Sequence, residues 1–211
     1  MKQTYFNIPG WFNYHESYDM IVDQIDSNGK IVEIGSFLGR STQYLATSLF
    51  NADKTDVTIY CIDTFKGSSE HANLKLPSDF YTMFRDNLKF FIGRDMVVPI
   101  QGRSDDPEIL NKFKDQEIDY IMVDGAHEYD AVLDDIENWW PKLKPDGVMF
   151  GDDFKLKSVE EAIRNMMPKL KNEGFSVNGS VEQTWFTSKT SSYKKFEKRV
   201  PGINCLKWAQ G

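Results

Sequence analysis

The sequence predicts an α/β protein built on a doubly wound, mostly parallel β-sheet. Short runs rich in Val and Ile alternate with longer amphipathic stretches along most of the chain, the pattern of alternating strands and helices. Each apolar run is followed by turn residues or acids. Near the C-terminus, two strand-like runs are joined through Asn178-Gly179-Ser180, and because Asn-Gly is a strong turn signal we expect an antiparallel strand pair there.

Five apolar runs are the expected parallel strands. They cover Lys30–Ile34, Val57–Ile62, Val97–Ile100, Tyr120–Val123 and Val148–Phe150. Runs of this length and composition are typical of strands that are buried on both faces of a sheet. The antiparallel pair is expected over Phe175–Val177 and Thr184–Thr187, where it would close one edge.

Six amphipathic stretches are the expected helices. They cover Trp11–Ile25, Ser41–Phe50, Phe80–Phe91, Asp106–Phe113, Tyr129–Leu143 and Ser158–Asn172. Ser41-Thr42 are residue types that cap helix N-termini, and Pro145 and Gly147 are stop signals after the fifth helix. In that fifth helix, Trp139-Trp140 are expected to pack in the core, and Asp130, Asp134, Asp135 and Glu137 to form a solvated face.

Size and composition indicate one globular domain. The chain has 211 residues, which we divide into an N-terminal helical segment (1–29), a core (30–187) and an extended tail (188–211) that packs partly through Trp208. Residues Ser68–Asp79 lack periodicity, and we predict a lid there because they follow the second strand. The composition leaves homo-oligomerisation open.

Charge and hydropathy exclude several classes of partner. The formal net charge of −7 disfavours a nucleic-acid partner, which usually needs a basic face. No apolar run reaches the ~18 residues of a membrane span, and the N-terminus has no signal-peptide core, so we expect a cytoplasmic protein without a membrane partner. Neither Cys61 nor Cys205 lies in a CxxC motif, which disfavours a disulfide framework or a Cys-based zinc site.

A glycine turn after the first strand is the most informative segment. Gly35 ends the strand, Gly39 follows in a tight turn, and a helix opens at Ser41-Thr42, so a ligand can approach the backbone at the carboxyl edge of the sheet. Glu33 is an acid near the end of an apolar strand, where a cationic ligand such as S-adenosylmethionine would explain it. The alternative for Glu33 is an acid that caps backbone amides at the strand end.

Polar residues follow the second and third strands as well. Asp63-Thr64 lie at the tip of the second strand, where an acid typically accepts hydrogen bonds from ribose hydroxyls, although such an acid can also simply start a turn. Gly102-Arg103-Ser104 follow the third strand and could flank an adenine or form an ordinary turn with a helix cap.

Three acids follow the fourth and fifth strands. Asp124 comes directly after one strand and Asp152-Asp153 after the other, so parallel strands would bring them together at the edge that holds the glycine turn. Carboxylates gathered in this way need a cation, and oxygen ligands favour Mg²⁺ or a similar divalent ion that could orient a substrate hydroxyl. His127 lies among these acids and is the candidate general base. The alternative is that the acids cap helices or orient substrate only, and that His127 caps the following helix or packs against Tyr129.

At this point the chain resembles a known family. The segments Val32–Thr42, Ile118–Val132 and Leu143–Asp153 are similar to three motifs of class I methyltransferases of the macrocin and cephalosporin-biosynthesis O-methyltransferase type. The resemblance spans roughly residues 30–155. It implies a seven-stranded class I methyltransferase sheet and methyl transfer from S-adenosylmethionine to a small-molecule hydroxyl. The resemblance does not identify the acceptor, which could be a sugar, a phenol or another hydroxyl compound.

The resemblance also implies site roles. It assigns Glu33, Gly35 and Ser36 to the methionine part of the cofactor and Asp63 to the ribose. Together with the residues of the turns described above, the expected cofactor-binding set is Glu33, Gly35, Ser36, Gly39, Ser41, Thr42, Asp63, Thr64, Gly102, Arg103, Ser104 and Asp124. Asp124, Asp152 and Asp153 would bind Mg²⁺, and His127 would act as the base. Two rival functions stay open: a cofactor-binding domain without catalysis, and a nicotinamide-dependent oxidoreductase, for which the glycine spacing is poor.

Overall fold

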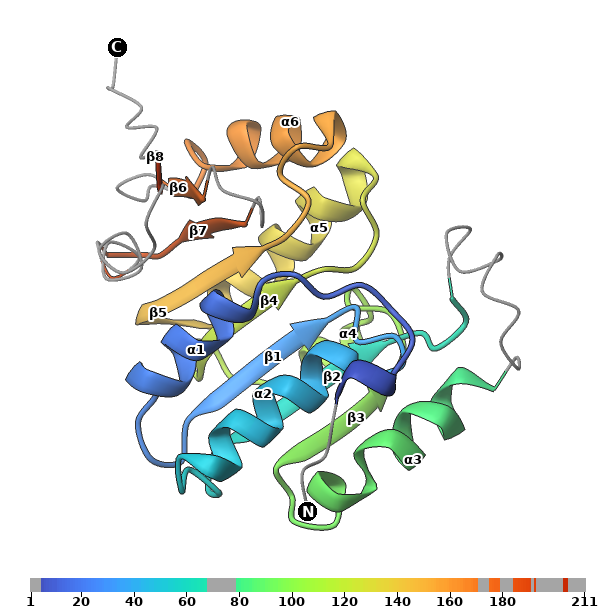
Figure 1. The fold of residues 1–211 in the computed structure, drawn as a ribbon. Coiled ribbons are helices and arrows are strands. Elements are labelled where there is room, and N and C mark those ends of the chain that lie inside the picture. The colour runs from blue at the N-terminus through green and yellow to red at the C-terminus, as the bar shows by residue number, and fades with distance from the viewer. Residues whose placement is uncertain are drawn as a thin grey trace.

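The computed structural model describes residues 5–67, 79–170, 175–178, 184–190, 192 and 203–204. Within them, eight strands form one sheet in the order β3-β2-β1-β4-β5-β7-β6-β8 (Figure 1). The strands are β1 (Lys30–Ile34), β2 (Thr58–Asp63), β3 (Val97–Gln101), β4 (Ile118–Val123), β5 (Leu143–Gly151), β6 (Phe175–Asn178), β7 (Trp185–Thr187) and β8 (Ile203–Asn204).

The expected sheet is confirmed. Strands β1 to β5 pair in parallel, and β7 runs antiparallel to both β5 and β6. Among the described residues the sheet has one strand more than the seven expected, because the two-residue β8 of the predicted tail pairs with β6. Apart from β8 and residues 188–190 and 192, the rest of the predicted tail, Trp208 included, lies outside the described part of the chain, as do residues 68–78 of the predicted lid.

Helices cover both faces of the sheet. They are η1 (Tyr5–Asn7), α1 (His15–Gln24), α2 (Arg40–Asn51), α3 (Phe80–Ile92), α4 (Pro107–Leu110), α5 (Tyr129–Trp139), η3 (Trp140–Lys142) and α6 (Lys157–Met166). Side chains of α1, α2 and α3 share one core cluster with Ile31, and side chains of α4, α5 and α6 share another with Val32. Neighbouring residues of β1 thus point to opposite faces, as the pleat of a strand requires.

Several helix boundaries differ from the prediction: α4 and α6 end earlier than expected, at Leu110 and Met166, and α1 and α5 differ for clear physical reasons. Helix α1 begins at His15 and not at Trp11, because the chain bends at Gly10, whose φ of +133° is not helical, and residues 11–14 form no regular structure. Helix α5 ends at Trp139 and passes into a 3₁₀ turn that contains Pro141, which lacks the amide hydrogen that a continued α-helix needs. Trp139 is fully buried, as expected.

The register brings four strand ends to one edge. Ile34 of β1 pairs with Ile62 of β2 and with Val123 of β4, and Val123 pairs with Gly151 of β5. The strand order reverses between β1 and β4, which is where ligands bind in open α/β sheets. In the part of the chain that the structure describes, no helix has both the length and the apolar character needed to cross a bilayer.

Candidate functional site

A cleft of about 870 Å³ lies at this carboxyl edge. Its walls come from the loops after β1 to β5 and from the N-terminal segment between η1 and α1, which passes over the strand tips as a dark blue trace in Figure 1. Volumes of this order suit a cofactor and a small ligand. The predicted residues on its wall are Gly35, Ser36, Ser41, Asp63, Thr64, Gly102, Arg103, Ser104, Asp124, His127, Asp152 and Asp153.

Glu33 is not on the cleft wall, which corrects the prediction that its carboxylate faces a cationic ligand. The residue is 0% exposed, and Tyr18 Oη donates to its Oε1 over 2.6 Å. Three further hydroxyls donate to the same carboxylate, those of Ser36, Ser41 and Thr42. Four donors therefore satisfy a charge that would be costly to bury alone. The buried Glu33 carboxylate thus bonds α1, the glycine turn and the first turn of α2 to β1.

The same contacts change the roles predicted for Ser41 and Thr42. Helix α2 begins at Arg40 after Gly39, and no side chain caps it. Both hydroxyls are committed to Glu33, and Thr42 is fully buried away from the cleft. Of this pair only Ser41 reaches the cleft wall.

The two glycines of the turn serve different purposes. A Cβ on Gly35 would lie 1.9 Å from the carbonyl oxygen of Asp124, so only glycine fits where β1 and β4 approach at the cleft floor. Gly39 has a φ of +83°, and a Cβ there would meet Leu88 of α3 at 2.6 Å. Gly39 is therefore a packing position and not a cleft residue, which corrects its predicted contact with the cofactor.

Asp63 anchors the loops on both sides of it. Its Oδ2 accepts the amide of Phe37 at 2.7 Å, and its Oδ1 accepts the amide of Phe65 at 2.6 Å. Both phenylalanines have positive φ, 44° and 52°, which are uncommon values for bulky residues. Asp63 also lines the cleft, so the residue that holds these two loops lies on the cleft wall at the tip of β2.

The loop after β3 carries Gly102, Arg103 and Ser104 into the cleft. Arg103 forms a bidentate ion pair with Asp105 at 2.8 and 2.7 Å, and its side chain is 74% exposed. The Ser104 hydroxyl donates to Asp135, and the Ser104 carbonyl accepts from Trp139 Nε1 at 3.0 Å. Helix α5 thus fixes the position of Ser104.

Asp135 is a cleft residue that the sequence prediction assigned wrongly to a solvated face. It is 4% exposed, and burial raises its pKa to about 6, an effect that the hydrogen bond from Ser104 opposes. The signal was present in the sequence. Asp135 lies on the stripe of Val132, Ile136 and Trp139, whose helical spacing marks the buried side of α5.

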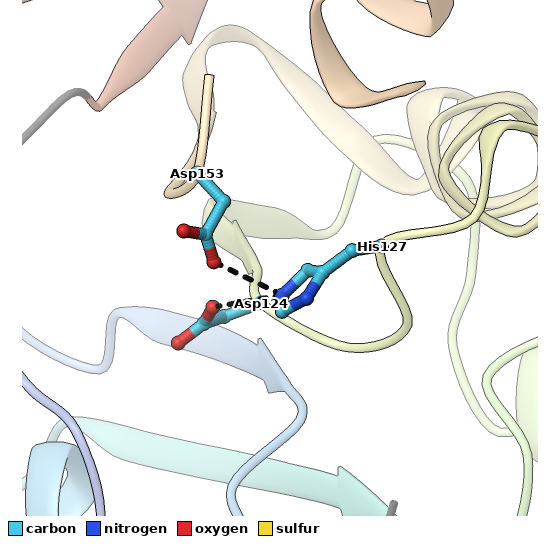
Figure 2. A group of neighbouring side chains, drawn as sticks. All are labelled: Asp124, His127 and Asp153. Carbon is cyan, nitrogen blue, oxygen red and sulfur yellow. Dashed lines mark ion pairs between the residues drawn. The ribbon is translucent and has the colours of Figure 1, made fainter. Parts of the chain in front are cut away.

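Asp124, His127 and Asp153 converge at the strand ends of β4 and β5 (Figure 2). His127 Nε2 lies 3.0 Å from Asp153 Oδ2 and 4.0 Å from Asp124 Oδ1. One ligand atom from each residue lies within 4.8 Å of the others. Two carboxylates and an imidazole form a donor set that fits a divalent cation.

The structure does not place Asp152 in the predicted role of a cation ligand. Asp152 lines the cleft but is not a member of the candidate metal group, whose third member is His127. Asp153 has a φ of +58°, a left-handed conformation that aspartate tolerates and that turns its side chain toward His127. The carboxylates of Asp124 and Asp153 raise the pKa of His127 to about 11, so without a cation the imidazole is protonated. In this arrangement it donates protons, and its predicted role as a base stays a prediction.

Tyr14 is a site residue that the motifs did not reveal. It is 1% exposed and lies just before α1, and its hydroxyl donates to Asp124 Oδ2 over 2.8 Å. Burial and the nearby Asp124 raise the pKa of Tyr14 well above its usual range, so the hydroxyl keeps its proton. The one sequence feature that pointed to Tyr14 is its spacing of four residues from Tyr18, because residues four apart lie on the same face of a helix. Tyr18 in turn contacts Glu33.

Comparison with known proteins identifies the family. The sequence profile of a methyltransferase-domain family matches residues 32–154. The uncharacterized protein y4gI of Sinorhizobium fredii (strain NBRC 101917 / NGR234) is 27% identical over 128 residues, which are 61% of this chain. The chain spans only 13% of the length of that curated relative.

Solved structures share the fold at low identity. The calicheamicin methyltransferase CalS11 has a TM-score of 0.63 at 15% identity, over 82% of this chain and 77% of its own. The O-methyltransferase NovP has a TM-score of 0.56 at 18% identity, over 83% and 79%. A putative caffeoyl-CoA O-methyltransferase from Staphylococcus aureus has a TM-score of 0.55 at 18% identity, over 86% and 85%.

The strand order, the carboxyl-edge cleft and the profile agree with one another. The profile covers more than half of the chain and begins and ends inside the motifs that form the cleft. The chain belongs to this methyltransferase-domain family and has the class I methyltransferase fold.

Proposed function

We propose that this chain transfers a methyl group from S-adenosylmethionine to a hydroxyl of a small molecule, with a divalent cation held by Asp124, His127 and Asp153. The observation that carries the proposal is the convergence of these three ligand groups within 4.8 Å on the wall of the cleft of a methyltransferase-family chain.

The cofactor half of the proposal rests on the loops after β1 and β2. Family membership implies S-adenosylmethionine, and Gly35, Ser36 and Asp63 line the cleft where its methionine part and ribose would lie. Asp63 lines the cleft at the tip of β2, where an acid typically accepts hydrogen bonds from the ribose hydroxyls. Ser104 and Asp135 lie on the same wall after β3, where they would flank the adenine.

The cation half rests on charge and donor type. Asp124 and Asp153 place two carboxylates beside one imidazole, with one ligand atom of each residue within 4.8 Å of the others. A divalent cation bound there would replace the extra proton of His127 as the counter-charge of the two carboxylates. A bound Mg²⁺ or Mn²⁺ would lower the pKa of an acceptor hydroxyl and orient it. The chain itself would hold the two reactants in line, and such alignment can contribute a substantial part of the reduction in the activation barrier.

The acceptor would lie toward the mouth of the cleft. Two large apolar side chains on its wall stay exposed, Trp11 at 63% and Leu156 at 41%, and they would contact the apolar part of an acceptor such as a phenol or a deoxysugar. Membership of a methyltransferase-domain family argues against the alternative of a nicotinamide-dependent oxidoreductase. A cofactor-binding domain without catalysis is the remaining rival.

Calorimetric titration with S-adenosylmethionine tests the proposal on the wild type and on two variants, Asp63→Asn and the control Asp115→Asn. Asp115 is a suitable control because its side chain is 68% exposed and pairs with Lys142. We expect micromolar binding by the wild type and the control, and about a tenfold loss in Asp63→Asn, or about 1.4 kcal/mol. Absence of binding in the wild type would overturn the proposal. Binding without any methylation across a panel of phenols and sugars, with Mg²⁺ present, would favour the non-catalytic rival.

A further inference from the structure

Tyr14 reaches the site from a part of the chain that none of the site motifs includes. Its hydroxyl donates to Asp124 Oδ2 over 2.8 Å, a contact that spans 110 residues of sequence. The donor comes from the N-terminal segment, and the acceptor follows β4. This contact therefore links the N-terminal segment, which forms one wall of the cleft, to Asp124, one of the three residues of the candidate cation site.

The two oxygens of Asp124 have different partners. Oδ2 accepts from Tyr14, and Oδ1 is the atom that lies 4.0 Å from His127 Nε2. With Oδ2 held by a hydrogen bond, the carboxylate cannot rotate freely about its terminal bond, and Oδ1 stays directed at the group formed with Asp153. Partners of this kind orient metal ligands and commonly matter nearly as much as the ligands themselves.

The tyrosine ring is itself held in place. It packs edge-on against Phe12 with centroids 4.8 Å apart and edge-on against Tyr18 with centroids 5.3 Å apart. Arg40 of α2 donates to the carbonyl of Gly10 at 2.6 Å, which ties the preceding turn of the segment to the body of the domain. Because the ring is packed on both sides, the Tyr14 hydroxyl has a fixed position. The hydrogen bond therefore orients the Asp124 carboxylate, whereas the ring is held by its own packing.

We propose that Tyr14 is a positioning residue that holds Asp124 in the orientation in which it binds the divalent cation. This inference rests on the proposed function, because it presumes that Asp124, His127 and Asp153 bind a cation. It adds the N-terminal segment to the machinery of the site, since the segment supplies both a cleft wall and the donor that orients a ligand.

Mn²⁺ binding measured by the electron paramagnetic resonance signal of the free ion tests the inference without a turnover assay. The variants are Tyr14→Phe, Tyr14 replaced by 4-aminophenylalanine, and the control Tyr44→Phe. Tyr44 also donates to an aspartate, Asp19, at 2.7 Å, and it lies in the same aromatic cluster but outside the cleft. Thermal melting and S-adenosylmethionine binding are recorded for each variant.

We expect Tyr14→Phe to weaken Mn²⁺ binding by about tenfold to a hundredfold. Tyr44→Phe should match the wild type, and 4-aminophenylalanine, which restores a donor at the same position, should recover most of the affinity even if Tyr14→Phe proves unstable. Affinity in Tyr14→Phe within about threefold of the wild type would overturn the inference while the proposed function stands. A wild type that binds S-adenosylmethionine but no Mn²⁺ would remove the cation from the proposed function and the inference with it.

Discussion

The hydroxyl of Tyr18 donates to the buried carboxylate of Glu33 over 2.6 Å. Helix α1 is thereby bonded to β1 through a charge that has no access to solvent, and the same carboxylate holds Ser36 in the glycine turn. A buried charge is stable only while its donors remain, so this contact links the docking of the N-terminal helix to the shape of the cleft floor.

Removal of that donor should destabilise the protein. Tyr18→Phe deletes one of four hydroxyl donors to a fully buried carboxylate, and hydrogen bonds to charged groups contribute about 1.5–3 kcal/mol. We expect the free energy of unfolding in urea to fall by about 2 kcal/mol. Tyr44→Phe, which loses a solvent-exposed hydrogen bond to Asp19, should cost less than half as much. Equal costs in the two variants would contradict the role assigned to Glu33.

Asp135 should make stability depend on pH in a defined direction. Burial raises its pKa from 3.8 to about 6, so between these values the folded state keeps a proton that the unfolded state releases. The stability that this proton contributes is complete below pH 3.8 and is lost as the pH rises through 6. We therefore compare the free energy of unfolding in urea of Asp135→Asn with that of the wild type at the same pH. This difference should move in favour of the variant by about 2–3 kcal/mol between pH 4 and pH 7.5. A difference that does not change with pH would refute this.

Gly35→Ala should disrupt the cleft floor. The new Cβ would lie 1.9 Å from the Asp124 carbonyl oxygen, at a φ of +89° that alanine rarely adopts. We expect a loss of at least about 3 kcal/mol in stability, or a folded variant without detectable S-adenosylmethionine binding. Gly93→Ala is the control, since its Cβ would meet only the Lys89 carbonyl oxygen at 3.3 Å, and calorimetry should find its binding unchanged.

The two adjacent acids after β5 should differ in their effect on cation binding. Asp153 belongs to the group with His127 and Asp124, whereas Asp152 only lines the cleft. Asp153→Asn should weaken Mn²⁺ binding by about tenfold or more, and Asp152→Asn by much less. The electron paramagnetic resonance titration distinguishes the two. The reverse order would restore the sequence-based assignment of Asp152 as a ligand.

Cys61 should be unreactive in the folded protein. It is a free thiol with 0% exposure, and burial, together with the nearby Glu33 charge, raises its pKa well above its usual range. Little thiolate is then available to react. Iodoacetamide followed by peptide mass spectrometry should leave Cys61 unlabelled in buffer and label it fully in urea. Labelling in buffer at the rate seen in urea would mean that the Glu33 network opens readily.

The sequence by itself determined the fold class and where the site lies. The apolar runs fixed five strands, and parallel pairing then required the residues after them, Gly35, Asp63, Asp124 and Asp152-Asp153, to emerge at one edge. This inference needs only local pattern and the geometry of a parallel sheet, so it could be made before any contact was known.

Tertiary structure alone decided which side chains meet. Glu33 was predicted to face a ligand but is enclosed by hydroxyls from α1 and α2, and His127 takes the place of Asp152 beside Asp124 and Asp153 in the candidate metal group. Tyr14 meets Asp124 across 110 residues. Periodicity describes residues a few positions apart, whereas the direction of a side chain at a strand tip depends on loop dihedral angles and on distant partners, which no local pattern encodes.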